Sequence, residues 1–85
     1  MSEQDYNATI VVVDDEEMVL TSLGSFLTLE TDYNVKTFTS AKEAIKFIED
    51  NDVDLVISDY LMPEMDGISF LAKVRNIKPN IPRII

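Results

Sequence analysis

The chain has 85 residues, of which 46% are hydrophobic and 27% are charged, a balance typical of one small globular domain. Seven basic against sixteen acidic residues give a formal net charge of −9, which argues against nonspecific binding of this segment to DNA or to anionic membranes. The absence of cysteine and histidine excludes disulfides, thiolate catalysis, histidine-ligated metals and a phosphohistidine on this chain. No apolar run is long enough to span a bilayer, and the acidic first residues lack the features of a secretory signal, so we expect a cytoplasmic protein.

Hydrophobic periodicity predicts strands and helices that alternate along the chain. We expect strands at residues 8–13, 35–38 and 55–59, and a fourth strand that begins at residue 83. Helices are expected from residue 16 or 17 to about residue 30, over residues 41–50, and over about 67–76. This order is typical of an α/β fold with a doubly wound parallel sheet and helices on both of its faces.

The spacing of apolar residues predicts the buried face of each helix. The predicted stripes are Val19, Leu23, Phe26 and Leu27 in the first helix, Ala41, Ala44, Ile45 and Ile48 in the second, and Ile68, Leu71, Ala72 with either Val74 or the stem of Arg75 in the third. Ser40 and Asp66 stand at the positions of helix N-caps, where a side-chain oxygen accepts a hydrogen bond from the first turn.

Asp59 follows an apolar run at the carboxyl end of the third strand, the edge at which open α/β sheets bind their ligands. Asp14 and Asp15 follow the first strand in the same way. If the two strands are neighbours, three carboxylates converge in one shallow cleft, where two charges about 5 Å apart repel by roughly 3 kcal/mol at an effective dielectric constant of 20. Mg²⁺ would offset this repulsion, because it prefers carboxylate, carbonyl, water and phosphate oxygens as ligands.

These residues resemble the receiver domain of the response regulators of two-component signalling. The resemblance rests on the paired acids Asp14-Asp15 after the first strand and on the pattern Asp59-x-x-Met62-Pro63-x-x-Asp66-Gly67 after the third. It implies a flavodoxin-like receiver fold with strand order 2-1-3-4 within residues 1–85, ordered from about residue 8. It also implies that Asp59 accepts a phosphoryl group from the phosphohistidine of a sensor histidine kinase or a phosphotransfer protein.

The resemblance further implies a metal-binding role for individual residues. Mg²⁺ would be bound directly by Asp15, by Asp59 and by the backbone carbonyl of Leu61, whereas Asp14 would act through a metal-bound water. The domain would catalyse only its own phosphorylation and slow dephosphorylation, and it would therefore be a switch and not a turnover enzyme.

Receivers also carry a Ser or Thr after the fourth strand and a Lys after the fifth, and both contact the phosphoryl group. The sequence stops within the expected fourth strand, so we expect residues 1–85 to form the N-terminal portion of a receiver with an incomplete sheet. An uncovered sheet face and an unpaired fourth strand then predict an oligomer, or strand exchange between copies.

Two other functions remain open on the sequence. A receiver-like module could act only by docking to other proteins, without phosphotransfer. An aspartyl-phosphate phosphatase would need a nucleophile and an acid two residues apart after one strand. Asp14-x-Glu16 is the nearest candidate for that pair, and its glutamate is at the wrong position.

Overall fold

The computed structural model describes residues 7–59, 62 and 65–84. Within them the elements follow one another as β1 (Thr9–Val13), α1 (Glu17–Glu30), β2 (Asn34–Phe38), α2 (Ala41–Asp50), β3 (Leu55–Ser58), α3 (Gly67–Ile77) and β4 (Arg83–Ile84). Every predicted strand and helix is present, and each predicted boundary agrees to within about one residue. Among the described residues, no helix is both long and apolar enough to cross a membrane.

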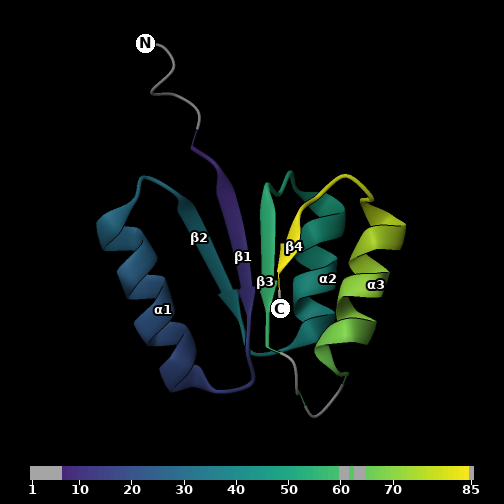
Figure 1. Cartoon of the computed structure of the whole chain (residues 1–85), viewed down its shortest axis with the longest axis horizontal. Helices are drawn as coiled ribbons and strands as arrows, with labels where there is room; N and C mark the ends of the chain where they lie inside the picture. The colour runs from purple at the N-terminus through teal and green to yellow at the C-terminus, as the bar shows by residue number, and fades with distance from the viewer. Residues whose placement is uncertain (1–6, 60–61, 63–64, 85) are drawn as a thin grey trace.

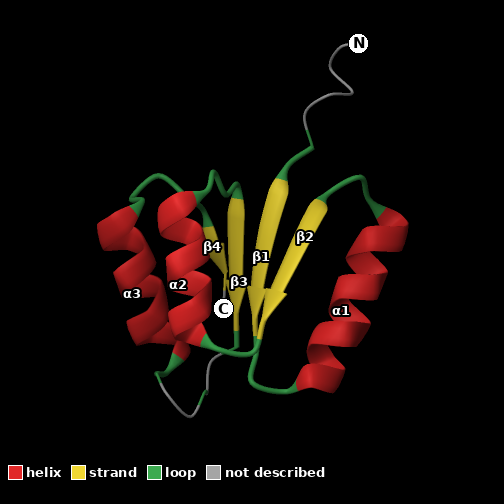
Figure 2. Cartoon of the chain, turned by 180° about the vertical axis from the view of Figure 1, so that it is seen from behind, coloured by secondary structure: helices red, strands yellow, loops and turns green. Residues whose placement is uncertain are grey.

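The four strands form one parallel sheet in the order β2-β1-β3-β4, which confirms the predicted order. Figures 1 and 2 show α1 on one side of the sheet and α2 and α3 together on the other side. Because all four strands run in the same direction, their carboxyl ends lie at one edge, together with the loops that lead into the helices. That edge contains the acidic residues singled out in the sequence.

The larger core cluster lies between the sheet and the pair α2 and α3. Alternation along β1 sends Val11 and Val13 to this face and Ile10 and Val12 to the opposite face. The helices contribute Ala41, Ala44 and Ile48 from α2 and Phe70 and Val74 from α3. Full burial of a side chain such as that of Ile or Phe contributes roughly 1.5–3 kcal/mol. This cluster therefore anchors β1 and β3 side by side, and with them the residues that follow each strand.

The smaller cluster lies under α1 and consists of Ile10, Val12 and Leu20, with other side chains half-buried around it. The prediction that Val19 and Phe26 face the core is wrong, because these side chains are 42% and 60% exposed and the core contact is made by Leu20. The physical reason is that α1 is the only helix on this face in the part of the chain that the structure describes, so only one side of it meets a neighbour.

Because α1 is the only described helix on its face of the sheet, that face of β3 is also incompletely buried. Val56 and Ser58 are buried on the α2 and α3 side, whereas Leu55 and Ile57 on the α1 side are only half-buried. The continuous apolar run before Asp59 predicts a strand that is buried on both faces. The expectation is confirmed for one face, and the other face is incompletely covered among the described residues.

Helix α3 is rotated relative to the prediction. Phe70 and Val74, four residues apart, are fully buried, whereas Ile68 is 59% exposed. Ala72 and Arg75 are also exposed, so of the predicted stripe only Leu71 and Val74 face the interior. The rotation places the large Phe70 ring in the core, where it removes more apolar surface from water than the side chain of Ile68 would.

Both predicted N-caps are present. The Ser40 hydroxyl accepts a hydrogen bond from the Glu43 N–H at 3.4 Å, and the Asp66 carboxylate accepts one from the Ser69 N–H at 2.7 Å. Asp66 therefore fixes the first turn of α3, the helix that follows the loop after β3.

Candidate functional site

Neighbouring parallel strands bring the predicted acids to one edge of the sheet. β1 and β3 pair directly, with Val13 opposite Ser58 at their carboxyl ends. Just after β1 and just after β3, the backbone is hydrogen-bonded to a neighbouring strand. The Asp59 N–H donates to the Val13 carbonyl at 2.9 Å, and the Asp14 N–H donates to the Phe38 carbonyl of β2 at 3.1 Å. The backbones of two candidate site residues are thus held by the adjacent strand.

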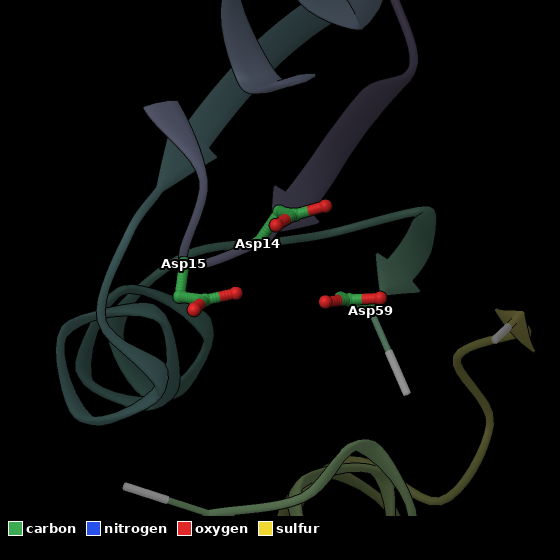
Figure 3. A group of neighbouring side chains, drawn as sticks. All are labelled: Asp14, Asp15 and Asp59. Carbon is green, nitrogen blue, oxygen red and sulfur yellow. The ribbon is translucent and has the colours of Figure 1, made fainter. Parts of the chain in front are cut away.

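The side chains of Asp14, Asp15 and Asp59 converge, as predicted. One carboxylate oxygen from each lies within 4.8 Å of the corresponding oxygens of the other two. Figure 3 shows the carboxylates of Asp15 and Asp59 directed toward each other, with Asp14 beside the gap between them. Asp15 is exposed, and Asp14 and Asp59 are half-buried, so the cluster is open to a ligand from solvent.

Asp14 is held by a local hydrogen bond, because its Oδ1 accepts from the Glu16 N–H at 2.9 Å. Burial raises the pKa of the Asp14 carboxyl above its ordinary value; the Glu16 hydrogen bond opposes this, and the charges of Asp59 and Asp15 raise the pKa further. One oxygen of Asp14 is therefore engaged with the backbone, and the carboxylate as a whole lies in an electrostatically unfavourable place. Such a cluster is stabilised by a cation.

The donor set of the cluster fits Mg²⁺. The three side chains offer only carboxylate oxygens, which are the hard ligands that Mg²⁺ and Ca²⁺ select, and no sulfur or imidazole. The backbone carbonyl of Leu61, predicted as a further ligand, lies outside the described residues. Asp66 does not join the cluster but caps α3, and the Ser69 N–H hydrogen bond lowers the pKa of its carboxyl.

Sequence reasoning missed one residue beside the cluster, Ser58. Its side chain is buried, and its hydroxyl donates to the backbone carbonyl of Asp59 at 2.9 Å. The available signal was a polar residue at a position of β3 where strand alternation calls for an apolar one.

An apolar surface adjoins the acids on the side of α1. A shallow groove of about 630 Å³ is lined by Glu16, Met18, Val19, Ser22 and Leu23. The Met18 side chain is 83% exposed, so the groove presents a large apolar side chain to solvent next to Glu16.

Comparison with known proteins agrees with the geometry. The family described as "Response regulator receiver domain" matches residues 10–85. The transcriptional regulatory protein GlrR of Escherichia coli (strain K12) is 41% identical over 78 residues, and the sensor kinase CckA of Brucella abortus (strain 2308) is 37% identical over 78 residues. These alignments cover 92% and 88% of this chain but only 17% and 8% of the two relatives. The chain thus corresponds to a small part of each.

A solved structure shows the same fold. The CheY-like response regulator receiver domain protein from Methanospirillum hungatei JF-1 superposes with a TM-score of 0.87 at 28% sequence identity. The superposition covers 93% of this chain and 63% of that protein. The order β2-β1-β3-β4 and the three helices are therefore shared with a larger domain of the same architecture.

Proposed function

Because this chain belongs to the response regulator receiver family, we propose that it is a phosphoacceptor of a two-component phosphorelay and that Asp59 is the residue phosphorylated. One observation carries the proposal. The carboxylate of Asp59 lies at the carboxyl end of a central strand, with the carboxylates of Asp14 and Asp15 within 4.8 Å. Asp66, the other acid of the motif, is engaged as a helix cap and lies apart from the cluster.

In the proposed reaction, a carboxylate oxygen of Asp59 attacks the phosphorus atom of a phosphohistidine on a partner protein. An O–P bond forms, the P–N bond breaks, and the electron pair of that bond stays on the imidazole nitrogen. The half-buried position of Asp59 at the end of a rigid strand orients the carboxylate for in-line attack. The product is an acyl phosphate on this chain, so the domain modifies itself and does not turn over a substrate.

Asp14, Asp15 and Asp59 would hold Mg²⁺, with Asp14 acting through a bound water and the Leu61 carbonyl as a further ligand. When bound, Mg²⁺ supplies positive charge that offsets the charge on the phosphoryl oxygens. The acids themselves would hold the cation beside the Asp59 carboxylate. The raised pKa of Asp14 supports this assignment, because a nearby cation would offset the charges of Asp59 and Asp15, which add to the effect of burial on that pKa.

The proposed partner is a sensor histidine kinase or a phosphotransfer protein. The apolar groove at Met18 and Val19 supports contact with a protein donor, because it lies next to Glu16 and so beside the acids. A partner that brings its phosphohistidine to Asp59 would cover this surface. A cytoplasmic location remains a prediction from the cysteine-free composition.

The alternative of a docking module without phosphotransfer is favoured by the same exposed groove. The two functions differ in whether Asp59 becomes phosphorylated. The test uses the full-length regulator with acetyl phosphate and Mg²⁺, and compares the parent with Asp59→Asn and Asp66→Asn. Asp66→Asn is the matched control, since asparagine also caps helices and the change likewise removes one carboxylate.

We expect acid-labile phosphate on the parent and on Asp66→Asn, and none on Asp59→Asn. Equal incorporation in the parent and in Asp59→Asn would refute the assignment of the phosphoacceptor. No incorporation in any of the three proteins would favour the docking module.

A further inference from the structure

Ser58 places a hydroxyl in the core of the sheet, immediately before Asp59. Its side chain is 3% exposed, and no other polar residue in the described part of the chain is buried to this extent. Val56 on the same face of β3 and Val13 opposite it in β1 are both fully buried. A buried hydroxyl is unfavourable unless it makes a hydrogen bond, so the bond that Ser58 makes is informative.

That bond holds the backbone carbonyl group of Asp59. The Ser58 hydroxyl donates to the Asp59 carbonyl at 2.9 Å, while the Asp59 N–H donates to the Val13 carbonyl at 2.9 Å. Asp59 lies just beyond the last residue of β3, where the ladder between β1 and β3 ends. Both peptide groups of this residue are therefore held, one by the neighbouring strand and one by the side chain before it.

The direction of a side chain depends on the backbone that carries it. The Asp59 carboxylate lies within 4.8 Å of two other carboxylates, and like charges favour any backbone rotation that separates them. The hydrogen bond from Ser58 opposes such a rotation. We propose that Ser58 is a positioning residue that holds the Asp59 carboxylate toward Asp14 and Asp15. This inference rests on the function proposed above for Asp59.

The test compares Ser58→Ala, which removes the hydroxyl, with Ser58→Thr, which keeps it, in the full-length protein. Ser25→Ala removes an exposed hydroxyl on α1 and is the matched control. The first measurement is hydrogen exchange of the Asp59 amide in EDTA, with the Asp14 amide as internal reference, because the latter is bonded to β2. We expect about tenfold faster exchange at Asp59 in Ser58→Ala, and little change at Asp14. Ser58→Thr and Ser25→Ala should match the parent.

The second measurement is Mg²⁺ affinity by calorimetric titration. We expect Ser58→Ala to weaken binding about tenfold, as loss of a supporting hydrogen bond does in other metal sites, and Ser58→Thr to restore it. Unchanged exchange at Asp59 in Ser58→Ala would overturn the inference. Equal acceleration at Asp59 and Asp14 would also overturn it, since Ser58 would then affect only the stability of the sheet. Failure of the parent to bind Mg²⁺ would count against the proposed function, while the exchange data would still decide the role of Ser58.

Discussion

Val13 and Ser58 lie opposite each other in adjacent parallel strands, and an acidic residue follows each of them. The Asp59 N–H bonds to the Val13 carbonyl, so the second acid leaves the sheet directly beside the first. The pairing of β1 with β3 is thus sufficient to bring these acids together, and their mutual repulsion is a consequence of the fold. A cation that relieves this repulsion should stabilise the folded chain.

We therefore expect Mg²⁺ to raise the melting temperature of the protein relative to EDTA. Binding to the folded state alone adds roughly 2.7 kcal/mol to the free energy of unfolding at a hundredfold excess of ligand over its dissociation constant. Asp15→Asn should lose most of this gain, because it removes one of the three carboxylates of the cluster. Glu49→Gln, an exposed acid at the far end of α2, serves as control and should keep it. A folded parent with the same melting temperature in both buffers would contradict the metal assignment.

The sequence predicts the ends of the strands better than it predicts which face of each helix is buried. The strand ends and the acids after them were predictable, because the apolar runs before Asp14 and Asp59 are short and sharply bounded. The outward position of Phe26 and Ile68 was not, because the side of a helix that is buried depends on which neighbours cover it. The hydrogen bond of the Ser58 hydroxyl could not be predicted from the sequence either, since it depends on the backbone geometry at the end of β3.

The free energy of unfolding should depend on pH through the Asp14 carboxyl, whose pKa is raised in the folded chain. A carboxyl whose pKa is higher in the folded than in the unfolded chain binds protons more readily when folded. The free energy of unfolding therefore falls as the pH rises from the ordinary value of 3.8 through the raised folded value, and the loss persists at neutral pH. Asp14→Asn keeps an oxygen that can accept the Glu16 hydrogen bond but removes the charge.

In EDTA at pH 7, we expect Asp14→Asn to be more stable than the parent by an amount of the order of 1 kcal/mol or less, because water screens this open site. The difference should disappear in urea titrations carried out below pH 3.8, the ordinary pKa. It should also shrink when Mg²⁺ is added, since the cation offsets the repulsion from Asp59 and Asp15, which adds to burial in raising the pKa of Asp14. A variant less stable than the parent in EDTA at pH 7 would show that the charge of Asp14 does not destabilise the folded chain.

Two phenylalanine substitutions test the observed orientation of the helices. Phe70 is fully buried between the sheet and α2, so Phe70→Ala should cost about 3–5 kcal/mol, enough to unfold much of a small domain. Phe26 is mostly exposed, so Phe26→Ala should change the free energy of unfolding by no more than about 0.5 kcal/mol in the monomer. Circular dichroism during urea unfolding measures both. Similar losses for the two variants would mean that α1 is packed more completely than the structure indicates.

Exposed apolar surface on the α1 side of the sheet predicts self-association of the 85-residue chain. Leu55 and Ile57 are half-buried, Val19 and Phe26 are exposed, and Ile84 of the edge strand β4 is 51% exposed. Each such side chain gains up to roughly 1.5–3 kcal/mol when it is fully buried. β4 also ends the sheet within the described residues, and an edge strand offers its backbone N–H and C=O groups to a strand of another chain.

We expect the isolated chain to form a dimer or a larger oligomer at micromolar concentration, through β4 or the α1 side of the sheet. Ile84→Lys should shift it toward the 9.6 kDa monomer, because a charged side chain on an edge strand opposes pairing. Ile68→Lys is the matched control, since Ile68 is similarly exposed but lies on α3, on the opposite side of the sheet. Sedimentation equilibrium distinguishes the cases. A cooperative, well-folded parent monomer would show that the half-buried residues of β3 tolerate water, and that α1 alone covers its face of the sheet well enough.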